Sequence, residues 1–205
     1  MARSVAEIAT AATIYANAFV VGGVLMGFEM LGSRYLFPYF GGGIGTWASL
    51  ISMVLCALAI GYFVGGAIVD RHPSPRVVAV AIMLAAAYLA FVPAAADHVM
   101  SWILAMIGDG AWATLLAAAA LLLLPLSLLG TLSPVAVRLL IRSTGETGRV
   151  AGLVYGISTI GNVVGTLLTT FTLIPTIGSR SITYLYAAVL AASAASLFCA
   201  HRRAV

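Results

Sequence analysis

Charge is scarce in this chain, and lysine is absent from it. Only 8% of the 205 residues are charged and 62% are hydrophobic, and all ten basic residues are arginine. Because an ordinary soluble domain has roughly 25% charged residues, a fold surrounded by water would lack a polar covering. Continuous apolar runs satisfy their backbone groups inside hydrocarbon by forming helices. The composition therefore predicts an all-α bundle that spans a lipid bilayer.

Motifs that carry chemistry are also missing. Cys56 and Cys199 lie far apart in apolar runs, which gives neither a metal spacing nor a disulfide framework. The sequence has no zinc-protease motif, no CxxC and no nucleophile elbow. Its arginines are spread through short loops rather than gathered in one basic patch. We therefore expect no catalytic residue, no metal site, no cofactor and no nucleic-acid partner in this chain.

Six apolar stretches are each long enough to cross a bilayer, which requires about 20 helical residues. The first stretch exceeds the length of a signal-peptide core and contains Glu29, so we interpret it as a retained span. Residues 1–205 then form one transmembrane domain. The predicted spans are 10–32, 47–69, 77–96, 111–132, 149–172 and 181–200.

The distribution of arginine predicts how the spans are oriented. Six spans place both termini on one side, together with the loops after the second and fourth spans, and that side holds eight of the ten arginines. The opposite side holds only Arg34 and Arg180. Since short arginine-rich loops stay cytoplasmic, we predict that both termini are cytoplasmic, in a bacterial-type plasma (inner) membrane.

Glycines recur at four-residue spacing in the second and fifth spans. This spacing lets helix backbones approach closely in lipid, where no hydrophobic effect drives helices together. We expect tight packing between helices of this chain, and a dimerisation face is the alternative. The glycines are Gly61, Gly65, Gly152, Gly156, Gly161 and Gly165.

Polar or helix-breaking residues interrupt several spans. Glu29 is the only acidic residue inside a span, where an ionised carboxylate requires a partner or a watery cavity. Arg34 or Arg180 could pair with it and form an outer gate or solute site; alternatively, Glu29 lies close enough to the boundary to reach headgroups. Asn162 predicts an interhelical hydrogen bond or a solute contact. Pro125 predicts a kink or a broken helix end.

Charged residues also mark the predicted cytoplasmic side. Asp70 and Arg71 end the second span and could latch neighbouring helices through a charge-assisted hydrogen bond; a simple stop-transfer anchor is the alternative. Arg138 and Arg142 are spaced so that both lie on one face of a short interfacial helix. That face would meet anionic headgroups or a cytoplasmic partner.

Several blocks follow one another in order between about residues 20 and 182. The most specific begins at Gly152, runs through Tyr155 to Asn162 and ends at Gly165. The others are 29–34, 38–47, 61–71, 125–138 and 173–180. Together they resemble the transmembrane module of membrane-bound spermidine synthase-like proteins. In that family, helices similar to half of a major facilitator transporter precede a cytoplasmic aminopropyltransferase-like domain.

The resemblance implies a module that moves or channels a small charged solute, for instance a polyamine. It also implies an alternative, a non-transporting scaffold that anchors or regulates a cytoplasmic aminopropyltransferase-like enzyme or a membrane complex. The sequence stops at Val205, where the soluble domain would begin, so aminopropyl transfer is not expected of this chain alone. The partners we expect are the lipid bilayer and either a second copy or a different membrane or cytoplasmic protein.

Overall fold

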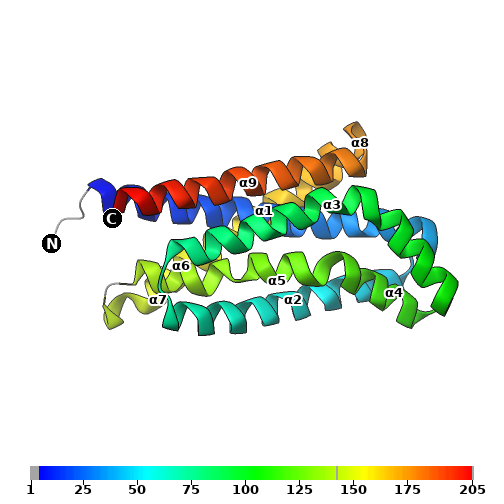
Figure 1. Cartoon of the computed structure of the whole chain (residues 1–205), viewed down its shortest axis with the longest axis horizontal. Coiled ribbons are helices and arrows are strands. Elements are labelled where there is room, and N and C mark those ends of the chain that lie inside the picture. Colours follow the sequence, from blue (N-terminus) through cyan, green and yellow to red (C-terminus); the bar gives the residue numbers. More distant parts are fainter. Residues whose placement is uncertain (1–4, 142, 205) are drawn as a thin grey trace.

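The structure is a computed structural model that describes residues 5–141 and 143–204, and all its regular elements there are helices (Figure 1). Six stretches are long and apolar enough to cross a membrane, so the chain is a six-helix multi-pass membrane protein, as the composition predicts. The elements are α1 (Val5–Phe40), α2 (Ile44–Arg71), α3 (Pro75–Ile107), α4 (Ala111–Ala118), η1 (Ala119–Leu123), α5 (Leu124–Gly130), α6 (Leu132–Leu140), η2 (Thr144–Glu146), α7 (Thr147–Leu168), η3 (Thr169–Leu173), α8 (Ile174–Thr176) and α9 (Ser179–Ala204).

Two helices are longer than the sequence pattern suggests. Helix α1 continues past residue 32 to Phe40, and α3 continues through the predicted loop at 96–109 as far as Ile107. The two extensions, 33–40 and 97–107, contain no glycine. Each helix ends just before a glycine that adopts a positive φ, +71° at Gly41 and +89° at Gly108. A proline alone did not end either helix, because Pro38 and Pro93 both lie inside.

Both termini of the bundle lie at the same end. Figure 1 shows the start of α1, the end of α9 and the connections α2–α3 and α6–α7 together at the left, with the other connections at the right. The left end also carries the exposed side chains of four arginines. They are Arg71, Arg76, Arg138 and Arg149. We call this the terminal end of the bundle, and the opposite end the outer end.

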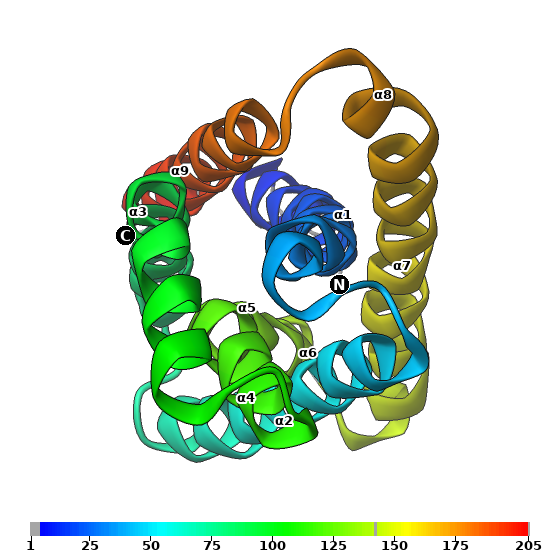
Figure 2. The ribbon, with the colours of Figure 1, turned by 90° about the vertical axis from the view of Figure 1, so that its right-hand side faces the viewer.

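Helix α1 forms the centre of the bundle. No residue from Val21 to Gly32 is exposed. Figure 2 shows α1 in the middle, with α7 on one side and α3 and α9 on the other. Helices α2 and α7 are the least covered of the spans, and they present many large apolar side chains on their outer faces. In a protein of this composition, these faces contact lipid.

Close helix packing depends on four of the six predicted glycines. A Cβ atom on Gly161 or Gly165 of α7 would overlap the α1 backbone at Phe19 and Gly23. On α2, a Cβ on Gly61 would lie 2.9 Å from the Cα of Gly130, and Gly65 approaches Thr131 in the same way. The absence of a side chain is therefore what lets these backbones meet.

The packing expected at Gly152 and Gly156 is not found within the described chain. A Cβ atom on either glycine would meet nothing within 4 Å. The reason is rotational: nine residues, as from Gly152 to Gly161, turn a helix by about 180° beyond two full turns. Gly152 therefore lies on the face of α7 opposite the one that α1 covers.

Pro125, where the sequence predicts a kink or a broken helix end, follows a π-helical segment, and the fourth span continues through it without a break. Residues Ala119–Leu123 form η1, and Pro125 follows two residues after its end. The fifth span repeats this arrangement, because η3 ends at Leu173 and Pro175 follows two residues later. Proline has no N–H to donate, so one carbonyl of the helix loses its usual donor. In a π-helical turn, that carbonyl belongs to the residue five positions before the proline.

Candidate functional site

Glu29 lies deep in the membrane-spanning part of α1. Its residue is only 6% exposed. The span Ile8–Phe40 has its midpoint at residue 24, five residues away, which is about 7.5 Å along a helix. The hydrocarbon extends about 15 Å from its centre. Glu29 therefore lies closer to the middle of its helix than the predicted bounds 10–32 indicate.

The charge partners expected for Glu29 are not beside it. Among the described residues, Glu29 makes no hydrogen bond or ion pair. Arg34 follows five residues later, which places it about 140° around the helix, and its side chain is exposed. Arg180 forms an ion pair with Asp97 instead. The structure thus corrects the predicted pairing of Glu29 with either arginine.

Arg180 belongs to a polar cluster at the outer end. The guanidinium of Arg180 contacts the Asp97 carboxylate, which also accepts a hydrogen bond from the Tyr39 hydroxyl at 3.3 Å. These residues join the end of α1 and the start of α9 to the interior of α3. Asp97 was missed because residues 96–109 were expected to be a loop. The pair is more than half exposed on both sides, so it contributes only about 0–1 kcal/mol.

A small polar cavity lies near the middle of the bilayer. Its volume is about 30 Å³, enough for one water molecule. Leu58 and Asn162, which line it, lie at the midpoints of their spans, Ile44–Arg71 and Thr147–Thr176. The polar side chains on its wall come from α2, α6 and α7. They are Tyr62, Ser133, Ser158 and Asn162.

Asn162 joins α7 to α1 at this cavity. With its amide oriented so that the nitrogen donates, it bonds the carbonyl oxygen of Gly22 at 2.8 Å and that of Ser158 at 3.3 Å. This is the interhelical hydrogen bond that the sequence suggested. Gly22 cannot carry a side chain, because a Cβ atom there would overlap the Ser158 carbonyl. Asn162 therefore both fastens α1 to α7 and lines the cavity.

Glu29 and the cavity share one face of α1. Seven residues separate Glu29 from Gly22, which is nearly two helical turns and about 10 Å of rise. Glu29 thus lies outward of the cavity on the same side of the helix. An acidic group and a mid-membrane polar cavity are arranged along one line through the centre of the bundle.

Other buried polar contacts fasten α1 to its neighbours. The Asn17 amide donates to the Ser196 hydroxyl at 2.9 Å and accepts from Ser193, both on α9. The Tyr35 hydroxyl bonds Thr183 at 2.9 Å. Sequence reasoning missed this set, because isolated serines and threonines in apolar runs form no pattern. Asn17, a buried amide within an apolar run, was the one signal available.

The predicted latch at the terminal end remains a prediction. Asp70, Arg71 and Arg138 are all exposed. In the part of the chain that the structure describes, none of them forms a hydrogen bond or an ion pair. Arg142 lies outside the described residues. Arg138 lies on α6. This helix is not a separate interfacial helix but continues the fourth span to Leu140.

Comparisons with protein-family models, with curated proteins and with solved structures find no match to this chain. The resemblance to the spermidine synthase-like membrane module therefore has no support beyond the residues that suggested it. The chain is an integral multi-pass membrane protein with six helical spans that contact the lipid bilayer.

Proposed function

We propose that this protein is a transport-type module that moves or channels a small cationic solute, such as a polyamine. One observation carries the proposal: Glu29, which is 6% exposed, has no hydrogen-bond or ion-pair partner among the described residues and lies on the face of α1 that also borders the mid-membrane cavity. Ionisable residues inside a span are rare and mark substrate or ion pathways. A carboxylate selects for positive charge, and Asn162, Ser133 and Ser158 offer hydrogen bonds to an amine.

The size of the cavity implies that the structure is a closed state. A cavity of about 30 Å³ admits one water molecule and no polyamine. Solute passage therefore requires α2 or α7 to move away from α1. Both are the least covered spans, which is consistent with mobile walls on this side of the bundle. In this proposal the module resembles half of a major facilitator transporter.

The arginines support an orientation for the proposed module. The four exposed arginines at the terminal end face the cytoplasm in this proposal, in a bacterial-type inner membrane, because short arginine-rich connections are retained there. Glu29 then lies on the outward side of the cavity. Arg34 and the Arg180–Asp97 pair lie at the outer end, where in this proposal they form the outer gate.

Removing one polar group from the cavity tests the proposal. Reconstituted liposomes should take up more labelled spermidine than protein-free vesicles do. Ser133→Val should lower the initial uptake rate by about tenfold, which is the effect expected from the loss of roughly one hydrogen bond. The matched control, Ser52→Val, changes an exposed serine on α2 and should transport like the unaltered protein. Equal rates for the two variants, or no uptake above protein-free vesicles, would contradict the proposal.

A second candidate function is a scaffold for a cytoplasmic enzyme or a membrane complex. It is favoured by Asp70, Arg71 and Arg138 at the terminal end, whose side chains are exposed and unpaired within the described residues. Purification from membranes in mild detergent separates the two hypotheses. The transport-type module is expected as two copies of this chain, and Arg138→Glu should leave that mass unchanged. The scaffold predicts instead a co-purifying protein that Arg138→Glu removes.

A further inference from the structure

The π-helical segment of the fourth span leaves one backbone carbonyl without its usual donor. In a π-helical segment such as η1 (Ala119–Leu123), each N–H is directed to the carbonyl five residues earlier, so the N–H of Leu124 is directed to Ala119 rather than to Ala120. The next donor in the ladder belongs to position 125, which is proline and has no N–H. The carbonyl of Ala120 is therefore left open. It lies between five and six residues from the middle of the span Ala111–Leu140, where no bulk water is available.

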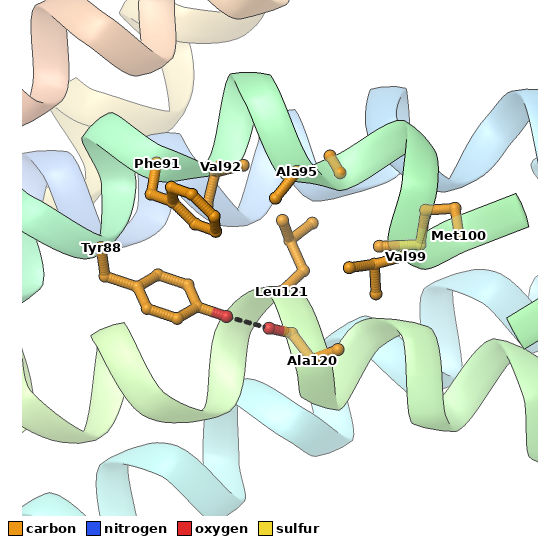
Figure 3. Close-up of a pocket in the computed structure, with 9 residues that line it drawn as sticks. Tyr88, Phe91, Val92, Ala95, Val99, Met100, Ala120 and Leu121 are labelled. Atoms are coloured by element: carbon orange, nitrogen blue, oxygen red, sulfur yellow. Dashed lines mark hydrogen bonds between the residues drawn. The ribbon is translucent and has the colours of Figure 1, made fainter. Parts of the chain in front are cut away.

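The hydroxyl of Tyr88 on α3 fills this gap. It donates a hydrogen bond to the carbonyl oxygen of Ala120, and Figure 3 shows the two atoms facing each other across the interface between α3 and η1. The match is specific to the π register. In an uninterrupted α-helix, proline at 125 would instead leave open the carbonyl four residues before it, that of Leu121. The tyrosine thus meets the carbonyl that only the π register exposes.

The fifth span provides a comparison within the same chain. There the N–H of Ile174 bonds the Thr169 carbonyl, and Pro175 leaves the Thr170 carbonyl open by the same rule. No side chain of the described residues donates to that carbonyl. Thr170 lies eight to nine residues from its span midpoint, about 13 Å, where boundary water is close. A side-chain donor is present only at the deeper of the two gaps.

A cavity beside the tyrosine leaves room for the fourth span to rearrange. It has a volume of about 110 Å³ and lies between α3 and η1, with Phe91, Val92 and Met100 on one wall and Leu121 on the other (Figure 3). Close packing between η1 and α3 is therefore incomplete at this point. Among the described residues, the Tyr88 hydrogen bond is the polar contact that does.

We propose that Tyr88 is a register latch that holds the fourth span in its π form. Release of the Tyr88 bond lets η1 convert to α-helix, which removes one residue from the turn and rotates α4 by up to about 100° relative to α5. Helix α4 packs against α2 and α3 at the outer end. The latch therefore sets which face of α4 these helices meet. This device does not depend on which solute, if any, the protein moves.

Cysteine reactivity on α4 reports its rotation. In a chain with Cys56 and Cys199 replaced by alanine, Trp112→Cys should react with a water-soluble maleimide, since Trp112 is 78% exposed, and Ala113→Cys should be protected, since Ala113 is fully buried. Adding Tyr88→Phe should raise the reactivity at position 113 by about tenfold, as expected for loss of one hydrogen bond in a membrane. Tyr35→Phe, which removes a different buried hydroxyl, should leave it unchanged.

A double-mutant cycle with Pro125→Ala identifies the cause. Alanine restores the N–H at position 125, so no carbonyl needs Tyr88, and Tyr88→Phe should then have no effect on reactivity at position 113. An unchanged reactivity of Tyr88→Phe in the chain that keeps Pro125 would overturn the proposal, as would an equal rise with and without Pro125→Ala. If Tyr88→Phe alone does not fold, recovery of folded protein in Tyr88→Phe/Pro125→Ala supports the latch, and failure to recover overturns it.

Discussion

Gly165→Leu should prevent the six helices from assembling. A side chain at this position meets backbone, not a flexible side chain: the new Cβ atom would lie 2.6 Å from the Cα of Gly23 and closer still to its carbonyl oxygen. Helices α1 and α7 must then separate, which removes the Asn162 bond to Gly22 as well. We expect the free energy of unfolding to fall by at least about 3 kcal/mol, the upper end of the range for overpacked cores. The change is detected as a lower unfolding midpoint in a titration with denaturing detergent.

The matched control lies on the same helix. Gly152→Leu places the same side chain on the uncovered face of α7, where nothing lies within 4 Å, and should leave the midpoint unchanged. Alanine sharpens the comparison, because Gly165→Ala should destabilise while Gly152→Ala should stabilise by about 0.5–1 kcal/mol through helix propensity. If both leucine variants lower the unfolding midpoint equally, the face of Gly152 is covered by another helix or a second copy.

The number and approximate placement of the helices could be predicted from the sequence. A span needs only a long apolar run, and an irregularity in the fourth span needs only a proline, so both signals are local. The ends of α1 and α3 were less predictable: Pro38 looks like a loop residue but lies inside α1, and α3 continues from the predicted end at residue 96 to Ile107. The positive φ of Gly41 and Gly108 decided those ends, and a glycine's φ is not visible in the sequence.

The composition of the candidate site could be predicted only in part. Glu29 and Asn162 were found because polar residues in apolar runs stand out. Their partners were not, because a partner depends on which faces of two helices meet: Arg180 bonds Asp97, and Asn162 bonds a backbone carbonyl. The glycine spacing in α7 likewise identified two close-packing stripes without showing that α1 covers only one of them.

Glu29→Gln should strongly reduce transport while leaving the protein at least as stable. The amide keeps the shape of the carboxylate but removes its charge, and a charge-assisted hydrogen bond to an ammonium group contributes about 1.5–3 kcal/mol. Initial uptake of labelled spermidine into liposomes should therefore fall by about tenfold to a hundredfold. Glu146→Gln, a change to an exposed acid at the terminal end, is the control and should transport normally.

Stability distinguishes a functional carboxylate from a structural one. Glu29 has no partner among the described residues, so its neutral replacement breaks no ion pair and relieves the desolvation of a buried charge. The unfolding midpoint of Glu29→Gln should consequently equal or exceed that of the unaltered protein, even as uptake is lost. A lower midpoint would mean that Glu29 holds the bundle together through a contact absent from this state. Unchanged uptake would remove Glu29 from the solute pathway.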